Sequence, residues 1–442
     1  MSRRPDRARA SWLLLAAGQD GSFWEEPGWD AAVRTGCQAR RPYPEELIEL
    51  PPGSRLQFLP GRHPLGWRGR SGPRPFRRGL ALAAQLPSGY TRTLLPAFER
   101  QEGIEHLPFF GYTAVVFRDE KVYCAAVQTD CNPHWEPSRY SAPDLPRRIE
   151  ALRARFPENR VLDQLKTCAL EYGCYNAQNV FYRRWEGAVA VSPSCNAQCR
   201  GCISLQPEDM PPSPQQRFGF VPTVEEVVEV GLHHLSGPES ILSFGQGCEG
   251  EPLLQADLIA ESIARLRRRT DRGTLHLNTN ASRPEGVRKI ALAGLDSIRV
   301  SLNSAVPERY EAYYQPRRYR FADVVDSIRV AREHGVYLCL NLLSMPGWND
   351  SVEELEALVR LVREHGVDMI QLRNLNIDPD LYGRFVPPPS QGVLGVPLWL
   401  ERLREECPGL ALGNHTPAVG SKGRASSALP QDSSPGRRGD LE

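Results

Sequence analysis

The 442-residue sequence has almost no net charge and no long apolar run. Its 54 Lys and Arg residues are balanced by 53 Asp and Glu residues, which leaves a formal charge of +1. This balance removes any whole-protein electrostatic argument for binding nucleic acid or an anionic membrane. No stretch approaches the roughly 18 apolar residues that a membrane-spanning helix needs. We therefore expect partners to be recognised by local groups of side chains, with neither nucleic acid nor a membrane among them.

The sequence also lacks a convincing secretory signal. Basic residues precede the apolar run from Trp12 to Ala17, but this run is shorter than the roughly 7–15 residues of a signal-peptide core. No small-residue cleavage site closes it. We predict a first β-strand after a basic tail, in a cytoplasmic protein. Without a secretory signal, the 11 cysteines are more typical of metal binding or catalysis than of a disulfide framework.

The chain is long enough for two folded units, because single cores stop growing near about 250–300 residues. Residues 1–145 are rich in Pro, Gly and Arg and carry short β-like runs such as SRLQFLP and TAVVFRDEKVYCAAVQ, which predict a mixed, β-rich accessory domain. Residues 146–186 predict a connector of two helices interrupted by Pro157. Residues 411–442 lack apolar periodicity and predict a disordered tail.

Residues 187–410 alternate short apolar runs with helical segments. The runs are AVAVS, SILSFG, TLHLNTN, SIRVSLNS, VYLCLNLLS and MIQLRNLNI, and we expect helices around 223–235, 254–270, 284–294, 321–334 and 351–365. This alternation predicts βαβ units and a parallel sheet, hence the α/β class. In partial barrels and in open doubly wound sheets alike, ligands gather at the carboxyl ends of the strands. Polar residues just after each run are therefore candidate site residues.

Three cysteines with the spacing C-x3-C-x2-C follow the first of these strands. They are Cys195, Cys199 and Cys202 in the segment SCNAQCRGC. A closed zinc site needs four ligands, and the next cysteine, Cys248, is far along the chain. A four-iron cluster held by three cysteines leaves one iron without a protein ligand. The spacing favours such a cluster with a small molecule at its open iron, whereas zinc ligation and three unpaired buried thiols remain alternatives.

By their spacing and their place, these cysteines resemble the signature of the radical S-adenosylmethionine (radical SAM) superfamily. The resemblance implies a partial (β/α)6 TIM-like barrel in which the open iron of a [4Fe–4S] cluster chelates the amino and carboxylate groups of SAM. It implies reductive cleavage of SAM to a 5′-deoxyadenosyl radical, with electrons from a donor such as flavodoxin or ferredoxin. The substrate, a small molecule or a peptide, and the catalytic residues that touch it stay unknown. The resemblance is nearest to members that modify peptides or build cofactors.

The resemblance extends over roughly residues 187–378. The segment FGQGCEGEPLL is similar to the family's Gly-Gly-Glu-Pro motif, with Gly250, Glu251 and Pro252 matching and Glu249 in place of the first glycine. A glycine turn lets backbone carbonyl groups and the Glu251 carboxylate approach the ammonium group of SAM. Glu251 could also cap the helix that is expected to start near Leu253.

Further SAM contacts are implied at the ends of later strands. The resemblance assigns hydrogen bonds near the cofactor to Thr279 and Asn280, the ribose to Ser301 or Asn303, the adenosyl part to Asn341 and Gly347, and a place on the sixth strand to Arg373 and Asn374. Each of these polar residues could instead simply end a strand. Arg373 could alternatively form a salt bridge on the outer face.

Four other cysteines form two pairs in the sequence, Cys124 with Cys131 and Cys168 with Cys174. Their thiols would suffice for an auxiliary iron–sulfur or other metal site. The alternative is ordinary buried free cysteine, because Cys124 lies in a strand-like run and Cys168 in a helical one. Cys248 is interpreted as a packing residue close to the Gly-Glu-Pro turn.

The competing function is a non-catalytic module. In it, zinc or an iron–sulfur cluster would only scaffold a binding surface, or the cluster would sense redox state without cleaving SAM. A scaffold needs neither an open coordination site nor the Gly-Glu-Pro turn beside it, and a zinc scaffold needs a fourth ligand.

Overall fold

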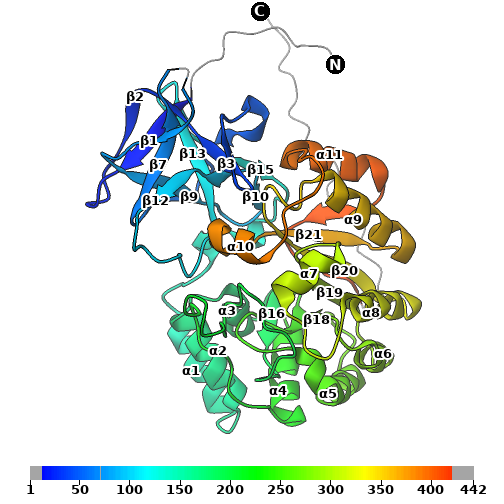
Figure 1. Cartoon of the computed structure of the whole chain (residues 1–442). Helices are drawn as coiled ribbons and strands as arrows, with labels where there is room; N and C mark the ends of the chain where they lie inside the picture. The colour runs from blue at the N-terminus through cyan, green and yellow to red at the C-terminus, as the bar shows by residue number, and fades with distance from the viewer. Residues whose placement is uncertain (1–11, 70, 421–442) are drawn as a thin grey trace, which may run out of the picture.

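The computed structural model describes residues 12–69 and 71–420 and contains two large β-sheets of different kinds. Figure 1 shows the N-terminal strands, blue to cyan, above a β/α unit coloured green to orange. The upper sheet has ten strands, is antiparallel and uses residues before 125, whereas the lower sheet has seven parallel strands and uses residues after 185. The basic tail predicted before Trp12 and residues 421–442 of the predicted tail lie outside the described residues.

The N-terminal unit is β-rich, as its sequence predicts. Its main sheet contains β1 (Leu13–Ala17), β2 (Phe23–Ala31), β5 (Ile48–Glu49), β6 (Arg55–Leu59), β7 (Arg62–Trp67), β8 (Arg74–Pro75), β9 (Leu80–Gln85), β12 (Phe98–Arg100), β13 (Tyr112–Arg118) and β14 (Lys121–Cys124). Smaller sheets join β3 (Val33–Thr35), β4 (Gln38–Arg40) and β11 (Leu95–Pro96), and β10 (Tyr90–Arg92) with β15 (Ala126–Gln128). Short 3-10 turns are η1 (Pro44–Glu46), η2 (Pro133–Trp135) and η3 (Pro137–Arg139).

Three helices, not the two predicted, connect the N-terminal unit to the parallel sheet. They are α1 (Leu145–Arg155), α2 (Arg160–Leu170) and α3 (Tyr175–Tyr182). Asn159 begins α2 by accepting a hydrogen bond from the backbone N–H of Val161, and this break contains Pro157, as expected. The second break follows Gly173, whose φ of +61° favours glycine. The sequence analysis overlooked this second break.

The lower unit is the predicted partial barrel. Its strands run in sequence order as β16 (Glu186–Val189), β17 (Ile241–Phe244), β18 (Thr274–Thr279), β19 (Ser297–Leu302), β20 (Tyr337–Ser344), β21 (Met369–Asn374) and β22 (Ala411–Gly413). Five expected helices are present as α4 (Val224–Leu235), α5 (Ala256–Arg269), α6 (Pro284–Leu292), α8 (Phe321–Glu333) and α9 (Val352–His365). The 3-10 turn η4 (Pro252–Gln255) stands where a helix was expected to start near Leu253, whereas α7 (Pro307–Tyr314), α10 (Pro379–Phe385) and α11 (Val396–Glu406) were not predicted.

Strand β22 corrects the predicted disordered tail. Its residues pair in parallel with β21 from Met369 to Gln371, so the tail prediction is wrong for residues 411–413. The side chain of Asn414 continues this contact by donating a hydrogen bond to the carbonyl oxygen of Leu372 at 2.5 Å. A three-residue strand is too short to show a period in sequence.

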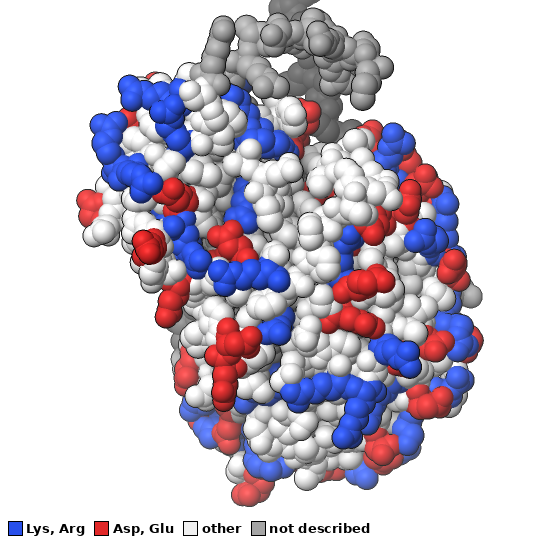
Figure 2. Space-filling model, viewed as in Figure 1, with Lys and Arg blue, Asp and Glu red and all other residues white. Residues whose placement is uncertain are grey.

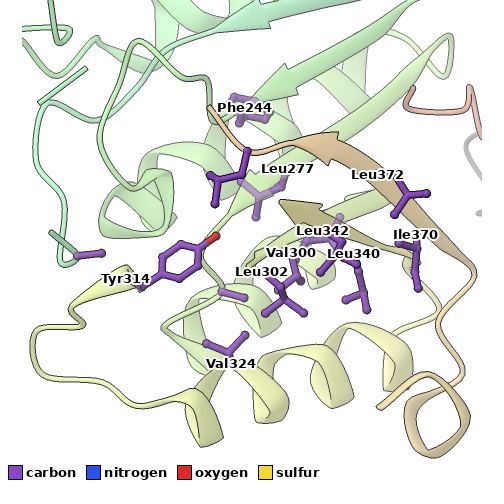
Figure 3. Packing of buried hydrophobic residues seen from close by; sticks show 14 of the residues in the cluster. Phe244, Leu277, Val300, Leu302, Tyr314, Val324, Leu340, Leu342, Ile370 and Leu372 are labelled. Carbon is purple, nitrogen blue, oxygen red and sulfur yellow. The ribbon is translucent and has the colours of Figure 1, made fainter. Parts of the chain in front are cut away.

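The parallel strands separate two kinds of side chain. Val300 and Leu302 of β19 and Leu340 and Leu342 of β20 are buried against the helices, as Figure 3 shows. Successive side chains of a strand point to opposite faces. The alternate residues of these strands, Arg299, Ser301 and Asn341, therefore point into the barrel interior, where they line a cavity. Because of this alternation, polar side chains lie on the inner face of the sheet, and apolar side chains pack against the helices on its outer face.

The two sheets are joined by buried polar contacts. The Arg62 guanidinium forms an ion pair with Asp378 at 3.1 Å, with both side chains almost completely buried. The fully buried Arg92 donates hydrogen bonds to the carbonyl oxygens of Phe110, at 3.2 Å, and Leu375, at 2.5 Å. These contacts fix the N-terminal unit against the end of β21.

The surface matches the balanced composition. Acidic and basic side chains are interspersed over most of the face in Figure 2, with basic side chains denser over the N-terminal strands. Among the described residues, no helix combines the length and the apolar character needed to cross a bilayer.

Candidate functional site

A cavity of about 630 Å³ lies at the carboxyl ends of the parallel strands. Every strand of the parallel sheet, or the loop after it, contributes lining residues. The N-terminal unit supplies the rest of the wall through residues 85–90, at the end of β9 and before β10, and through Phe109 and Gly111. Ligand sites of comparable size are typical at this end of a parallel barrel.

The three signature cysteines line this cavity together. Their loop follows β16 and is docked on the C-terminal end of α7, because the backbone N–H groups of Gln198 and Arg200 donate to the carbonyl oxygens of Tyr314 and Tyr313, each at 3.0 Å. The backbone N–H of Arg317 donates to the carbonyl oxygen of Asn196 at 2.8 Å. The fold therefore holds the loop from outside and leaves its thiols facing the cavity.

The thiols differ in their surroundings. Burial raises the pKa of Cys195 to about 11 and that of Cys199 well above its usual range. Burial opposes ionisation of Cys202 too, but hydrogen bonds from the Ser204 hydroxyl and from nearby backbone N–H groups lower the pKa of Cys202. The guanidinium of Arg217 also donates to the Cys202 sulfur at 3.4 Å. Arg217 was not singled out by the sequence analysis.

The three cysteines fit an iron–sulfur cluster better than a single zinc ion. Zinc ligands all lie within about 2.3 Å of their metal. No group of three His, Cys, Asp or Glu side chains in residues 12–69 and 71–420 is arranged to hold one metal ion. A four-iron cluster instead takes one thiolate at each iron, so its ligands stand further apart. Three thiols that line one cavity, with no other cysteine and no histidine among its lining residues, match a cluster with an open iron.

Glu249 supports the cysteine loop from behind. Its carboxylate accepts hydrogen bonds from the backbone N–H groups of Val191, Ser192 and Gln246 at 2.7, 2.8 and 2.9 Å. Burial raises the pKa of Glu249 to about 8. The residue that replaces the family's first glycine is therefore a brace between the turn after β17 and the strand that leads to the cysteines.

Gly250 allows the same turn to touch the cysteine loop. A Cβ atom at this position would lie 2.0 Å from the carbonyl oxygen of Ser194. The backbone N–H groups of Gly250 and Glu251 donate to the carbonyl oxygens of Ser192 and Ser194 at 2.7 and 2.8 Å. Only glycine fits this close approach of two backbones.

Glu251 has the capping role that the sequence suggested. It caps η4 by accepting the backbone N–H of Leu253 at 2.9 Å. It also accepts the hydroxyl of Thr279 and the backbone N–H of Asn280, and it lines the cavity with Pro252. Burial raises the pKa of Glu251 to about 7. The carboxylate thus ties the ends of two strands together beside the cysteines.

The structure sorts the other predicted contacts into two groups. Residues that line the cavity are Thr279, Asn280, Ser301, Asn341, Arg373 and Asn374. Asn280 also donates to the side-chain oxygen of Asn196 in the cysteine loop at 3.0 Å. The Oδ1 atom of Asn341 is buried without a hydrogen-bond partner in the described structure.

Two predicted contacts lie elsewhere. The Asn303 amide donates to the carbonyl oxygen of Arg309 and to the hydroxyl of Tyr382, each at 3.1 Å, and does not line the cavity. Gly347 packs against the N-terminal unit, where a Cβ atom would lie 1.9 Å from the nitrogen of Gly36. These interactions are structural, and Ser301 is the residue of β19 that remains available to a ribose.

Asn374 joins the two units. Its side-chain oxygen accepts the backbone N–H of Arg92 at 2.9 Å, and its amide donates to the carbonyl oxygen of Tyr90 at 3.1 Å. Asn374 therefore positions the wall of the cavity that residues 85–90 form.

The four cysteines proposed for an auxiliary site do not meet. Cys124 is buried in β14 and Cys131 is exposed, within the N-terminal unit. Cys168 instead lies beside Cys248, and their hydrogen bond lowers the pKa of Cys168 and raises that of Cys248. The Cys174 backbone N–H donates to the Cys168 carbonyl oxygen at 2.9 Å. The predicted grouping is wrong, and Cys248, interpreted as a packing residue, is the spatial neighbour of Cys168.

A parallel α/β barrel with three loop cysteines at its mouth, beside a Gly-Glu-Pro turn in one shared cavity, defines the class of the protein as a radical SAM fold. Residues 189–362 match the family model described as the Radical SAM superfamily. This region of the chain therefore carries a radical SAM domain.

Curated relatives are only distantly similar. Molybdenum cofactor biosynthesis protein 1 of Mus musculus is 24% identical over 308 residues, which are 69% of this chain and 43% of that protein. A probable GTP 3′,8-cyclase of Pyrobaculum aerophilum is 30% identical over 151 residues, 34% of this chain and 44% of that protein. The chain thus spans less than half the length of these two relatives. Among solved structures, methylornithine synthase (PylB) has a TM-score of 0.35 at 15% identity, covering 62% of this chain and 72% of that chain.

Proposed function

We propose that this protein binds a [4Fe–4S] cluster through Cys195, Cys199 and Cys202 and SAM at the open iron. When bound, this pair supplies a 5′-deoxyadenosyl radical by reductive cleavage of SAM. The observation that carries the proposal is that the three thiols, the Gly250–Glu251 turn and the polar ends of β18 to β21 all line one cavity. The turn and the cysteine loop are joined by direct backbone hydrogen bonds, so the protein positions both binding partners as one unit.

The chain's own residues would hold SAM in order along the sheet. Glu251 and the carbonyl groups around Gly250 and Pro252 suit the ammonium group, because they offer acceptors beside the cysteines. Thr279 and Asn280 fix the position of Glu251 through hydrogen bonds. Ser301 and the unpartnered amide oxygen of Asn341 offer hydrogen bonds to a ribose or an adenine. The N-terminal wall limits access of water to this side of the cavity.

The substrate would enter the same cavity beside residues 85–90. The relatives named for molybdenum cofactor biosynthesis and for GTP 3′,8-cyclase activity support a small molecule over a peptide. An electron donor such as flavodoxin or ferredoxin is part of the proposal. A cytoplasmic location also belongs to it, and the 11 free cysteines support a reducing compartment.

The test is anaerobic. The purified full chain is reconstituted with iron and sulfide, reduced, mixed with SAM and assayed for 5′-deoxyadenosine. Cys199→Ala should abolish the product, and Cys37→Ala, which removes an exposed cysteine far from the cluster in sequence, should not. If a cluster assembles in the wild type but no reductant yields 5′-deoxyadenosine, the protein is a redox sensor or a scaffold and the proposal fails.

A further inference from the structure

Two arginine side chains reach the cavity from strands far from the cysteines in sheet order. Arg299 lies on β19 and Arg373 on β21, and both line the cavity. Their strand neighbours Val300 and Leu372 belong to the apolar layer in Figure 3, so the two guanidinium groups point the opposite way, into the barrel. We call Arg299, Arg373, Ser301 and Asn341 the arginine end of the cavity.

Arg373 has no direct hydrogen-bond or ion-pair partner among the described residues. Within residues 12–69 and 71–420 its guanidinium makes no hydrogen bond, and no carboxylate lies within ion-pair distance of it. The side chain is half-buried and lines the cavity. Burial, together with the neighbouring charge of Arg299, lowers the pKa of Arg373 to about 10. A half-buried guanidinium that lines a cavity without a direct acceptor leaves its N–H donors available to a ligand.

Arg299 adds a second positive charge beside Arg373. It donates from Nη1 to the side-chain oxygens of Gln371 at 2.8 Å and Thr416 at 3.3 Å, which are both neutral acceptors. Its Nε atom is buried without a partner among the described residues. The arginine end therefore holds two positive side chains whose direct hydrogen bonds go to neutral groups.

Two carboxylates outside the cavity lining act on Arg373 at longer range. Burial opposes ionisation of Glu186, but the charges of Arg299 and Arg373 lower its pKa. Asp130 also acts on Arg373, and it accepts the backbone N–H groups of Asn414 and His415 at 2.8 and 3.2 Å. The carboxylates that line the cavity in the described residues, Glu249 and Glu251, both belong to the turn beside the cysteines. No carboxylate therefore lines the arginine end of the cavity among the described residues.

We propose that the arginine end binds an anionic oxygen group of the substrate, either a phosphate or a carboxylate. This inference rests on the proposed function, since it takes the cysteine end to be the place of SAM. Planar guanidinium groups bind such oxygens in a bidentate manner. Asn341 and Ser301 add neutral hydrogen-bonding groups next to the charge.

SAM does not account for the arginine end. Its ammonium, carboxylate and sulfonium groups all belong to the methionyl half, which the proposal places at the open iron. Its ribose and adenine carry no negative charge, so they gain little from two guanidinium groups. The opposite wall, from Gln85 to Tyr90, contributes no charged side chain. An anionic substrate that spans the space between this wall and the barrel would supply the missing counter-charge.

The experiment measures anion binding by the reconstituted, SAM-loaded full chain. Pyrophosphate and succinate serve as probes in isothermal titration calorimetry, and SAM affinity is measured separately. Arg373→Gln should weaken binding of the preferred probe by about 10- to 100-fold, the effect of losing a hydrogen-bonded charge. The control Arg360→Gln, on the exposed surface of α9, should bind like the wild type. A preference for pyrophosphate identifies a phosphate substrate, and one for succinate a carboxylate.

The inference is overturned if neither probe binds, or if Arg373→Gln binds the probe as tightly as the wild type. It is also overturned if this variant loses only SAM affinity, because Arg373 then belongs to the cofactor. If Arg373→Gln does not fold, Arg373→Lys replaces it; this variant keeps the charge, loses the planar fork, and should weaken the probe several-fold. A wild type that binds the probe but never forms 5′-deoxyadenosine would refute the proposed function and leave the anion site standing.

Discussion

The carboxylate of Glu249 lies 2.8 Å from the backbone nitrogen of Ser192, which precedes the first cluster cysteine by three residues. Glu249 occupies the position where the superfamily motif has its first glycine. The side chain points into the protein and binds the backbone that leads to the cysteines. The departure from the motif is therefore a structural brace, and it leaves the glycine turn at Gly250 intact.

Replacing Glu249 by alanine should loosen the cysteine loop. Three backbone N–H groups would lose their acceptor, and each buried unsatisfied donor costs about 1–3 kcal/mol. We expect lower iron and sulfide content after reconstitution and a lower urea midpoint. Glu285→Ala, at an exposed position in α6, is the matched control. Equal iron content in Glu249→Ala and wild type would show that the loop needs no brace.

Replacing Gly250 by alanine should displace the same loop, because the added methyl group has no room. The added methyl group would stand 2.0 Å from the Ser194 carbonyl oxygen, and such clashes typically cost about 1–3 kcal/mol. Cluster content, read from the absorbance of the reconstituted protein, should fall. At Gly219 a methyl group would have no neighbour within 4 Å, so Gly219→Ala should assemble a full cluster. A full cluster in Gly250→Ala as well would contradict the close approach.

Asp378→Ala should strongly destabilise the joint between the two sheets. Arg62, fully buried, would lose its only carboxylate contact among the described residues. Removing one partner of a buried ion pair costs about 3–5 kcal/mol, because the other charge stays buried. Chemical denaturation would measure this loss, with the exposed Asp271→Ala as control. Adding Arg62→Met should restore part of the stability, whereas an equal or larger loss in the double variant would argue against an uncompensated charge.

The buried Asp350 should make stability depend on pH. Burial raises the pKa of Asp350 to about 6, from 3.8, although the backbone N–H of Gly347 donates to it at 2.6 Å. Because the folded-state pKa is raised, its stabilising contribution is complete below about pH 4 and is lost as pH rises through about 6. The two-unit shift corresponds to about 3 kcal/mol.

Comparison with Asp350→Asn isolates this effect. The asparagine does not ionise. The unfolding free energy of the variant, relative to that of the wild type, should therefore rise by about 3 kcal/mol between pH 4 and pH 8. Urea unfolding at intervals of one pH unit would measure the difference. A difference that stays constant with pH would mean that Asp350 ionises as readily in the folded as in the unfolded chain.

The strands from β16 to β21 could be predicted because both faces of each are covered, which produces apolar runs between helical segments. Strand β22 could not, since Ala411–Gly413 is too short to carry a pattern. Helix α7, which docks the cysteine loop, was missed although its buried residues Tyr310, Tyr313 and Tyr314 have helical spacing, because its eight residues are too few for a convincing period.

The meeting of Cys195, Cys199 and Cys202 at one cavity was predictable from their spacing because all three lie in one loop. The remaining errors concern contacts between distant parts of the chain. Gly347 was placed at the cofactor because nothing near it in sequence reveals Gly36 as its neighbour. Cys248 was not associated with Cys168 for the same reason. Arg299 gave no signal, because a single charged residue in an apolar run does not show which face of the strand it occupies.

The cavity wall is shared between a barrel that carries the cluster residues and an N-terminal loop, residues 86–89, that carries none of them. Substitutions in this loop can reshape one side of the chamber without touching the cysteines, the Gly-Glu-Pro turn or their hydrogen bonds. One wall of the chamber can therefore change its shape independently of the end that carries the cysteines.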